Sequence, residues 1–230
     1  MKVKKVIATF CLALTGFIGA AAITAVQETD KLVYADFETL KDGRPISNGG
    51  GLVQLTSYEE RPTMKSRYKG IEGSNPPAPE LVRISKDSPN KAIAFEYELQ
   101  APNQYAGVGV EIHALADKDG KPVSIDVSQY KFLGLQLYVT GVQSIRVEFS
   151  TRGQGVPKSN ANPQMIFKIK PGLNTYQVPL KNLSQPSWAD VKLSPKDVLK
   201  KLTSVSVVAF CDQCTPTKGT VVVDDLVFQN

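Results

Sequence analysis

The sequence is poor in the residues that most often carry catalysis and metal binding. It has one histidine, three cysteines and one tryptophan in 230 residues. A Ser-His relay would have to use His113 itself, and histidines cannot cluster around a metal ion. Neither a nucleophile-elbow glycine pattern nor a phosphate-cradling glycine loop is present, and the triplet Gly49, Gly50 and Gly51 is a weak signal by itself. We therefore predict a protein that binds and is not an enzyme.

Dense positive charge is also lacking once the first residues are set aside. Lys2, Lys4 and Lys5 precede an uncharged stretch over residues 6–22, and small residues follow as far as Ala25. This order predicts a cleaved secretory leader over residues 1–25 and a single mature domain over residues 26–230, which would be secreted or periplasmic. The alternative is a retained anchor, because the apolar stretch approaches the ~20 residues of a spanning helix.

Removal of the leader's three lysines lowers the formal net charge from +5 to +2. With no dense Lys/Arg face, nucleic acid is a poor candidate partner. No basic amphipathic helix supports membrane binding after cleavage.

The mature chain alternates apolar and polar side chains with a period of two, which is typical of half-buried strands. Such strands are predicted at residues 93–99, 107–113, 132–139 and 145–150, with others at 32–38, 52–58, 164–170, 174–180, 203–210 and 219–228. Residues 59–80 hold four prolines and no apolar period, which predicts a long loop. One helix is expected, with Ser194 as N-cap, Pro195 in its first turn and an end near Leu202. One short helix among about ten strands predicts an all-β jelly-roll sandwich.

The cysteine pair Cys211 and Cys214 lies between two predicted strands. In an exported domain these two thiols should oxidise to each other, so we expect a structural disulfide. The alternatives are a redox couple, which normally needs a helix N-terminus, and half of a zinc site, which needs two further ligands.

Carboxylates occur in the first and the last predicted strand, at Asp36, Glu38, Asp224 and Asp225. First and last strands of a sandwich are often neighbours, and carboxylates that meet there repel unless they are paired or bridged. Ca²⁺ is the fitting ion because it takes oxygen ligands in flexible numbers. The alternative is a set of solvated side chains at the strand edge.

The hydrophilic strand faces are the candidate binding surface. If the strands at 107–113, 132–138 and 146–152 share a sheet, their outward side chains meet over a floor of glycines, and this set comprises Glu111, His113, Gln136, Tyr138, Arg146 and Glu148. An aromatic ring beside carboxylate, amide and guanidinium groups suits a sugar, whose ring face stacks while its hydroxyls take hydrogen bonds. The alternative is an ordinary solvated face. Trp188 is either packed on the sandwich edge, which we expect, or an exposed stacking platform.

Several motifs, in order, resemble galactose-binding-like β-sandwich domains of carbohydrate-binding modules, nearest to the family 11 type. They are ADFE at 35–38, DVSQYKFLG at 126–134, TYQVPL at 175–180, QPSW at 185–188 and VDDLVF at 223–228. The resemblance implies a jelly roll, a structural calcium near Asp36, Glu38, Asp224 and Asp225, and a glycan site on the concave sheet that includes Tyr105. A more distant resemblance is to the complex I intermediate-associated protein 30 family, an assembly factor.

Two functions follow as hypotheses. The first is a secreted, non-catalytic carbohydrate-binding protein. The second is a structural or assembly protein whose sandwich binds another protein through the loop at residues 59–80.

Overall fold

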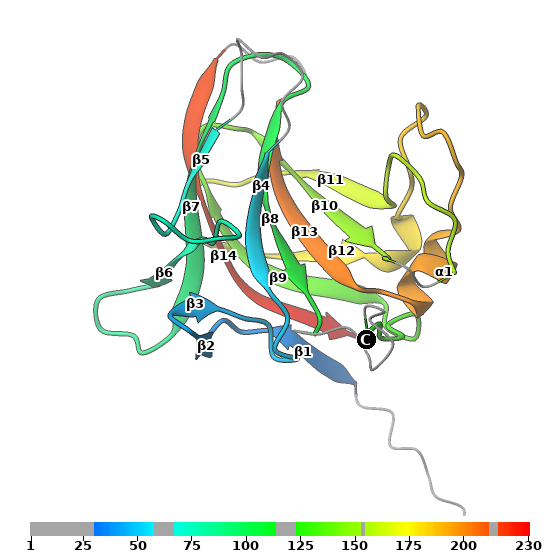
Figure 1. Cartoon of the computed structure of the whole chain (residues 1–230), viewed down its shortest axis with the longest axis horizontal. Helices are drawn as coiled ribbons and strands as arrows, with labels where there is room; N and C mark the ends of the chain where they lie inside the picture. The colour runs from blue at the N-terminus through cyan, green and yellow to red at the C-terminus, as the bar shows by residue number, and fades with distance from the viewer. Residues whose placement is uncertain (1–29, 58–66, 114–122, 153–154, 212–215) are drawn as a thin grey trace, which may run out of the picture.

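Two antiparallel sheets pack face to face in this computed structural model, which describes residues 30–57, 67–113, 123–152, 155–211 and 216–230 (Figure 1). The seven-stranded sheet comprises β1 (Lys31–Ala35), β5 (Arg67–Lys69), β6 (Glu80–Arg83), β7 (Lys91–Leu99), β9 (Phe132–Val139), β12 (Asn174–Pro179) and β14 (Thr217–Gln229). The five-stranded sheet comprises β4 (Val53–Ser57), β8 (Tyr105–Glu111), β10 (Ser144–Ser150), β11 (Gln164–Lys168) and β13 (Ser204–Phe210). A small hairpin, β2 (Leu40–Lys41) and β3 (Arg44–Pro45), lies beside them. The predicted all-β sandwich is confirmed.

Alternation along the strands builds the core between the sheets. In β10, Ile145, Val147 and Phe149 are fully buried, while the residues between them are partly exposed. β8, β9 and β13 also send alternate apolar side chains into the same cluster. Burial of alternate apolar side chains is the main force that holds the two sheets together.

The first and last strands are neighbours, as the sequence predicted. β1 pairs with β14 in antiparallel register, from Lys31 opposite Gln229 to Ala35 opposite Leu226. The buried Tyr34 of β1 donates a hydrogen bond across the core to the Val110 carbonyl oxygen of β8, at 2.7 Å. This bond adds a polar contact between the two sheets within the apolar core.

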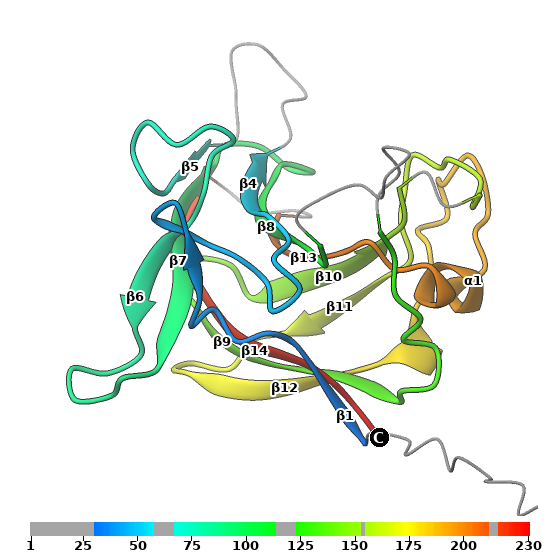
Figure 2. The ribbon, with the colours of Figure 1, turned by 60° about the horizontal axis from the view of Figure 1, so that its bottom comes forward.

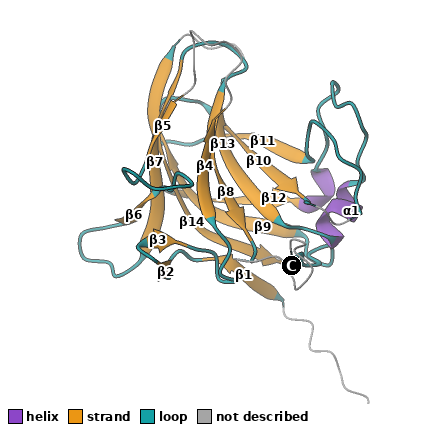
Figure 3. Cartoon of the chain, in the orientation of Figure 1, coloured by secondary structure: helices purple, strands orange, loops and turns teal. Residues whose placement is uncertain are grey.

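The helix begins as predicted and ends slightly earlier. Helix α1 spans Pro195–Lys200, and the Ser194 side chain accepts a hydrogen bond from the backbone N–H of Asp197. A 3₁₀ turn, η1, spans Leu180–Asn182. Figure 3 shows this helical region at one side of the strands. None of the helices in the described ranges is long and apolar enough to cross a membrane.

The predicted long loop at residues 59–80 is wrong in part. β5 lies inside it and β6 begins at its last residue, and both pair with β7. Residues 58–66 lie outside the described part of the chain. Strands this short carry too few side chains for an alternating pattern to stand out from the surrounding prolines and glycines.

The predicted grouping of three strands into one sheet is also wrong. β8 and β10 share the five-stranded sheet with β13 between them, whereas β9 lies in the seven-stranded sheet between β12 and β14 (Figure 2). Both sheets of a sandwich have one buried face, so alternation places a side chain inside or outside without assigning the strand to a sheet.

Candidate binding cleft

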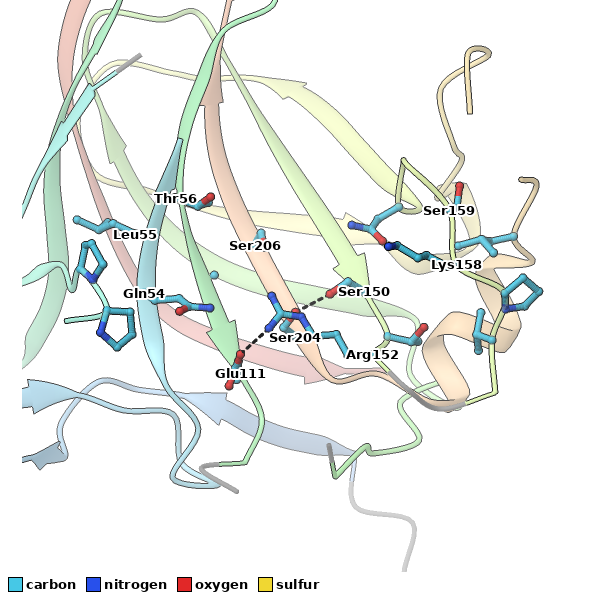
Figure 4. Close-up of a pocket in the computed structure, with 18 residues that line it drawn as sticks. Gln54, Leu55, Thr56, Glu111, Ser150, Arg152, Lys158, Ser159, Ser204 and Ser206 are labelled. Atoms are coloured by element: carbon cyan, nitrogen blue, oxygen red, sulfur yellow. Dashed lines mark hydrogen bonds and ion pairs between the residues drawn. The ribbon is translucent and has the colours of Figure 1, made fainter. Parts of the chain in front are cut away.

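A cleft of about 770 Å³ opens on the outer face of the five-stranded sheet. Its floor comes from β4, β8, β13 and β10; one wall includes Pro76 and Pro77, and the other comes from the segment that follows β10. Figure 4 shows Gln54 and Thr56 on one side of the cleft, with Lys158 and Ser159 on the opposite side. The lining is rich in hydroxyl groups, from Thr56, Ser150, Thr151, Ser159, Ser204 and Ser206.

Strand register brings these polar side chains together. Ser206 of β13 lies opposite Gly109 of β8, which lies opposite Gln54 of β4. In a neighbouring row, Ser204 lies between Ser150 and Glu111. Because side chains two residues apart point to the same face, the rows form a continuous hydrophilic floor.

Gly109 keeps the centre of this floor low. A Cβ atom at this position would lie 3.5 Å from Ser206 Oγ, which is an ordinary van der Waals distance. At Gly107, by contrast, a Cβ would meet the Val207 carbonyl oxygen at 2.8 Å. Gly109 therefore has room for a Cβ atom at the floor of the cleft, whereas a Cβ at Gly107 would clash with β13.

An ion pair crosses one end of the floor. Arg152 Nη1 donates a hydrogen bond to Glu111 Oε1 at 3.1 Å (Figure 4). Beside it, the hydroxyls of Ser150 and Ser204 lie 2.5 Å apart. The cleft thus presents a guanidinium, a carboxylate and hydroxyls that can both donate and accept hydrogen bonds.

Hydrogen bonds to two side chains hold the far wall in place. Gln185 Nε2 donates to the Ala161 carbonyl at 2.7 Å, and its Oε1 accepts from Leu193 N at 2.6 Å. Asp190 Oδ1 accepts from the backbone N–H of Asn160 and from Ser159 Oγ. The Asn160 hydrogen bond is the main cause that lowers the pKa of Asp190. These bonds join the segments that carry Ser159 and Leu193, both of which line the cleft.

Of the eight residues predicted to bind ligand, Glu111 lines this cleft. Arg146 and Glu148 lie on the same sheet face and pair with each other, with Nε to Oε1 at 2.6 Å. The Arg146 guanidinium also lies over the rings of Tyr105, at 5.3 Å, and of Phe210, at 5.4 Å. The Arg146 side chain is 16% exposed, so it is a packed residue and not a free hydrophilic one.

Three of the remaining residues do not line the cleft. Gln136 and Tyr138 belong to β9 and are on the outer face of the other sheet, where Gln136 Nε2 donates to Asp225 Oδ2 at 2.6 Å. The predicted convergence of these two with Glu111 is therefore wrong, because β9 lies in the seven-stranded sheet. His113 follows β8, and its Nδ1 lies 3.2 Å from the Gly49 carbonyl oxygen, so its ring has a hydrogen-bonding role in the fold.

Trp188 is exposed, contrary to the expectation that it packs on the sandwich edge. The residue is 63% exposed on the loop between Gln185 and Asp190. The backbone of this turn is held by Ala189 N, which donates to the Pro186 carbonyl, and by Lys192 Nζ, which donates to the Pro186 and Ser187 carbonyls. The loop satisfies its polar groups through backbone and lysine contacts and leaves the indole outside.

All four predicted calcium ligands have partners within the fold, and Glu38 Oε1 accepts a hydrogen bond from Lys91 N at 2.7 Å. Asp36 is bound to Asn48, through Nδ2 at 2.9 Å, and Asp225 accepts from Gln136. Asp224 is fully buried, accepts from Asn90 Nδ2 at 3.0 Å and has its Oδ1 atom without a hydrogen-bond partner. Burial, then the neighbouring Asp225 carboxylate, and also Glu38, raise the pKa of Asp224 to about 6.

Within the described ranges, no group of three or more His, Cys, Asp or Glu side chains is arranged to hold a metal ion. A cation here would therefore need amide or carbonyl oxygens in addition to Asp224 and Glu38. The calcium site stays a prediction.

The predicted disulfide also stays a prediction. Cys211 follows β13 and is 2% exposed, whereas Cys214 lies outside the described residues.

Sequence reasoning missed most of the cleft. Its unpredicted polar residues include Gln54, Thr56, Ser150, Arg152, Ser204 and Ser206. Alternation in β13, where Ser204 and Ser206 interrupt a run of buried valines, was a signal that could have marked this face. The wall residues beyond β10 carry no such pattern.

No known family model matches the sequence, and no curated protein matches it. Solved structures are similar in fold. A family 11 carbohydrate-binding module from Clostridium thermocellum, solved in complex with a β-1,3-1,4-mixed-linked tetrasaccharide, superposes with a TM-score of 0.54 and 14% identity, over 87% of this chain and 95% of that chain. The family 11 module of the cellulosomal cellulase Lic26A-Cel5E from the same organism gives 0.54 and 13% identity, over 87% and 94%.

At this identity the likeness concerns the fold. The resemblance to the complex I intermediate-associated protein 30 family stays a prediction. The chain has a β-sandwich fold like that of family 11 carbohydrate-binding modules.

Proposed function

We propose that the chain is an exported, non-catalytic carbohydrate-binding protein that holds a glycan in the cleft over the five-stranded sheet. The observation that carries this proposal is the row of hydroxyl side chains, with Gln54 and the Glu111–Arg152 pair, around the open floor at Gly109. Sugar hydroxyls both donate and accept hydrogen bonds, so they match a surface of serine, threonine, amide and charged groups.

The fold supports the same proposal. A sandwich of this kind carries a bound tetrasaccharide in the family 11 module described above, which is a property of that protein. Here the cleft is open and runs across several strands, a shape that suits a chain of sugar units better than a single buried monosaccharide.

The small number of carboxylates in the cleft supports the proposal of glycan binding without hydrolysis. Among the described residues that line the cleft, Glu111 is the one carboxylate, and it is paired with Arg152. Most glycosidases use two carboxyl groups on either side of the scissile bond, about 5–10 Å apart. Glu148, on the same sheet face, is paired with Arg146.

Export is proposed from the leader, which lies outside the described residues. Mass spectrometry of the protein secreted by an expressing cell would test it, with a mature chain that begins near Val26 as the expected result.

The main proposal is tested with a variant that fills part of the cleft. Gly109→Leu adds a side chain to the open floor without backbone strain, and we expect it to reduce glycan affinity at least tenfold while it leaves the unfolding midpoint nearly unchanged. A glycan array identifies the ligand, and titration calorimetry measures its affinity. The control is Thr175→Leu, which adds a leucine to the outer face of the other sheet, and it should bind like the parent protein.

Failure of the purified protein to bind any glycan on the array would overturn this proposal. Equal affinities of Gly109→Leu and the parent would move the glycan site away from the cleft. Recovery of a stable protein partner with no glycan binding would favour a structural or assembly role.

We also propose that a structural calcium ion lies between the first and last strands, with Asp224 and Glu38 among the four predicted carboxylates as its ligands. The buried, unpartnered Oδ1 of Asp224 fits a cation, which would neutralise the repulsion from the nearby carboxylates. A thermal melt with calcium and with a chelator tests this, and a higher midpoint with calcium is expected for the parent but not for Asp224→Asn. An unchanged midpoint in the parent protein would contradict the proposed calcium site.

A further inference from the structure

A second cavity, of about 490 Å³, lies away from the cleft. It is formed by the segment that leads into β9, the end of β12 with η1, and the start of α1. Figures 1 and 2 show α1 beside the carboxyl end of β12. No residue lines both cavities, so this pocket is a separate feature of the fold.

Backbone pairing explains why these segments meet. Leu180 N donates to the Lys131 carbonyl at 2.9 Å, which continues the register of β12 with β9 and places Lys131 opposite Leu180. Val127 N donates to the Leu199 carbonyl at 2.9 Å and so ties α1 to the segment before β9. The pocket is therefore built on hydrogen-bonded backbone from all three segments.

The wall of this pocket is largely apolar. Tyr130, Leu180 and Leu199 are buried, at 7%, 3% and 5% exposure, and Phe132 is partly exposed. Pro179 and Pro195 complete it. Such a surface gains free energy when a compact apolar group covers it.

Three lysines line the same pocket as the apolar wall. Lys131, Lys181 and Lys196 are all exposed and all line the pocket, each from a different segment. No ion pair between described residues involves any of them. The described lining contains no aspartate or glutamate; of the nearest carboxylates in sequence, Asp126 accepts the Ser128 N–H and Asp197 is exposed on α1.

A pocket that combines an apolar wall with exposed ammonium groups is complementary to a ligand that has both an apolar and an anionic part. A neutral apolar molecule leaves the lysines without partners, and a small inorganic anion leaves the apolar wall uncovered. We propose that this pocket is a second ligand site that takes an anionic group carried on a compact apolar ring. The carboxylate or sulfate would pair with the lysines while the ring covers Phe132 and Leu199.

Benzoate is the probe for this site. We expect saturable shifts in the amide NMR signals of Ser128, Leu180 and Leu199 with millimolar or tighter affinity. Benzamide has the same ring without the charge, and acetate has the charge without the ring. Each should bind at least tenfold more weakly than benzoate.

The variant is the triple substitution Lys131→Gln, Lys181→Gln and Lys196→Gln. Because these side chains are exposed, we expect it to fold normally and to lose benzoate binding at least tenfold. The matched control removes three exposed lysines elsewhere, Lys86→Gln, Lys168→Gln and Lys170→Gln, and should bind benzoate like the parent.

Equal affinity for benzamide, unchanged binding by the first triple variant, or shifts that map outside the pocket would each overturn the proposal. The outcome is independent of the glycan proposal. Glycan binding should shift the amides of Gly109 and Ser206 and persist in the triple variant.

Discussion

The Glu111 carboxylate lies 3.1 Å from Arg152 Nη1, although strand β13 separates the strands that lead to the two residues. The pair therefore spans the floor of the cleft at the level of Ser204. The Glu111 side chain is 24% exposed and that of Arg152 is 61% exposed, so both are accessible to a ligand in the cleft.

Glu111→Ala should weaken glycan binding about tenfold, because it removes a charged acceptor for sugar hydroxyls. The loss of stability should be below about 1 kcal/mol, since the partly exposed pair is screened by solvent. Calorimetry and urea unfolding measure the two effects. Glu98→Ala is the matched control, since Glu98 is 28% exposed and pairs with Lys218 at 3.4 Å on the other sheet. A similar loss of affinity in both variants would contradict a direct role for Glu111.

Arg146→Ala should destabilise the protein by roughly 2–3 kcal/mol, because Glu148 loses its partner at a site that is 19% exposed. Arg146→Lys should recover part of this loss, since an ammonium keeps the charge but not the planar contact with Tyr105 and Phe210. Urea unfolding provides the measurement. Full recovery by lysine would show that the rings contribute nothing.

Trp188→Ala should leave stability within about 0.5 kcal/mol of the parent, because the indole is largely in solvent. Trp188 is the single tryptophan, so intrinsic fluorescence reports its loop. If a long glycan extends from the cleft over this wall, tryptophan emission of the parent shifts to shorter wavelength when the glycan binds. Trp188→Ala then loses affinity for the polymer and keeps its affinity for a short oligosaccharide. Tyr138→Ala, on the opposite sheet, should change neither affinity. A loss of cleft binding in Tyr138→Ala would contradict the assignment of the site.

The raised pKa of Asp224 predicts an unusual pH dependence of the free energy of unfolding in the absence of calcium. Burial, and then Asp225, raise the pKa of Asp224 from its ordinary value of 3.8 to about 6. Between these values the folded protein keeps a proton that the unfolded chain has released, so this carboxyl makes stability fall as pH rises from about 4 to about 6. Asp224→Asn should flatten that slope and stabilise the protein at pH 7 by roughly 1–3 kcal/mol.

Urea unfolding in a chelator at several pH values measures this slope. Asp190→Asn is the comparison variant, because Asp190 contributes to stability with the opposite dependence on pH. Hydrogen bonds lower the pKa of Asp190, so its contribution is present at neutral pH and lost in acid. A parent protein whose stability rises from pH 4 to 6 and does so equally in Asp224→Asn would contradict the role of Asp224.

Much of the fold could be predicted because its signals are local. Alternation in β10 and β8 depends on which side chains avoid water, and the cap at Ser194 depends on residues within one helical turn. The pairing of β1 with β14 also followed from a general rule of sandwiches. Of the candidate site, the sequence predicted the Glu111 and Arg146 face but could not separate it from Gln136 and Tyr138.

By itself, the sequence determined an all-β sandwich, its buried strand faces and helix α1, because these follow from the period of apolar side chains and from the helix cap, both of which lie within short stretches. Only the tertiary structure decided which strands share a sheet, and so placed Ser204 between Ser150 and Glu111 and sent Tyr138 to the opposite surface. The same is true of the exposure of Trp188 and of the pocket beside α1 that three lysines line. The physical reason is that each of these features depends on contacts between residues far apart in the chain, whose pairing minimises the free energy of the whole domain and leaves no local pattern.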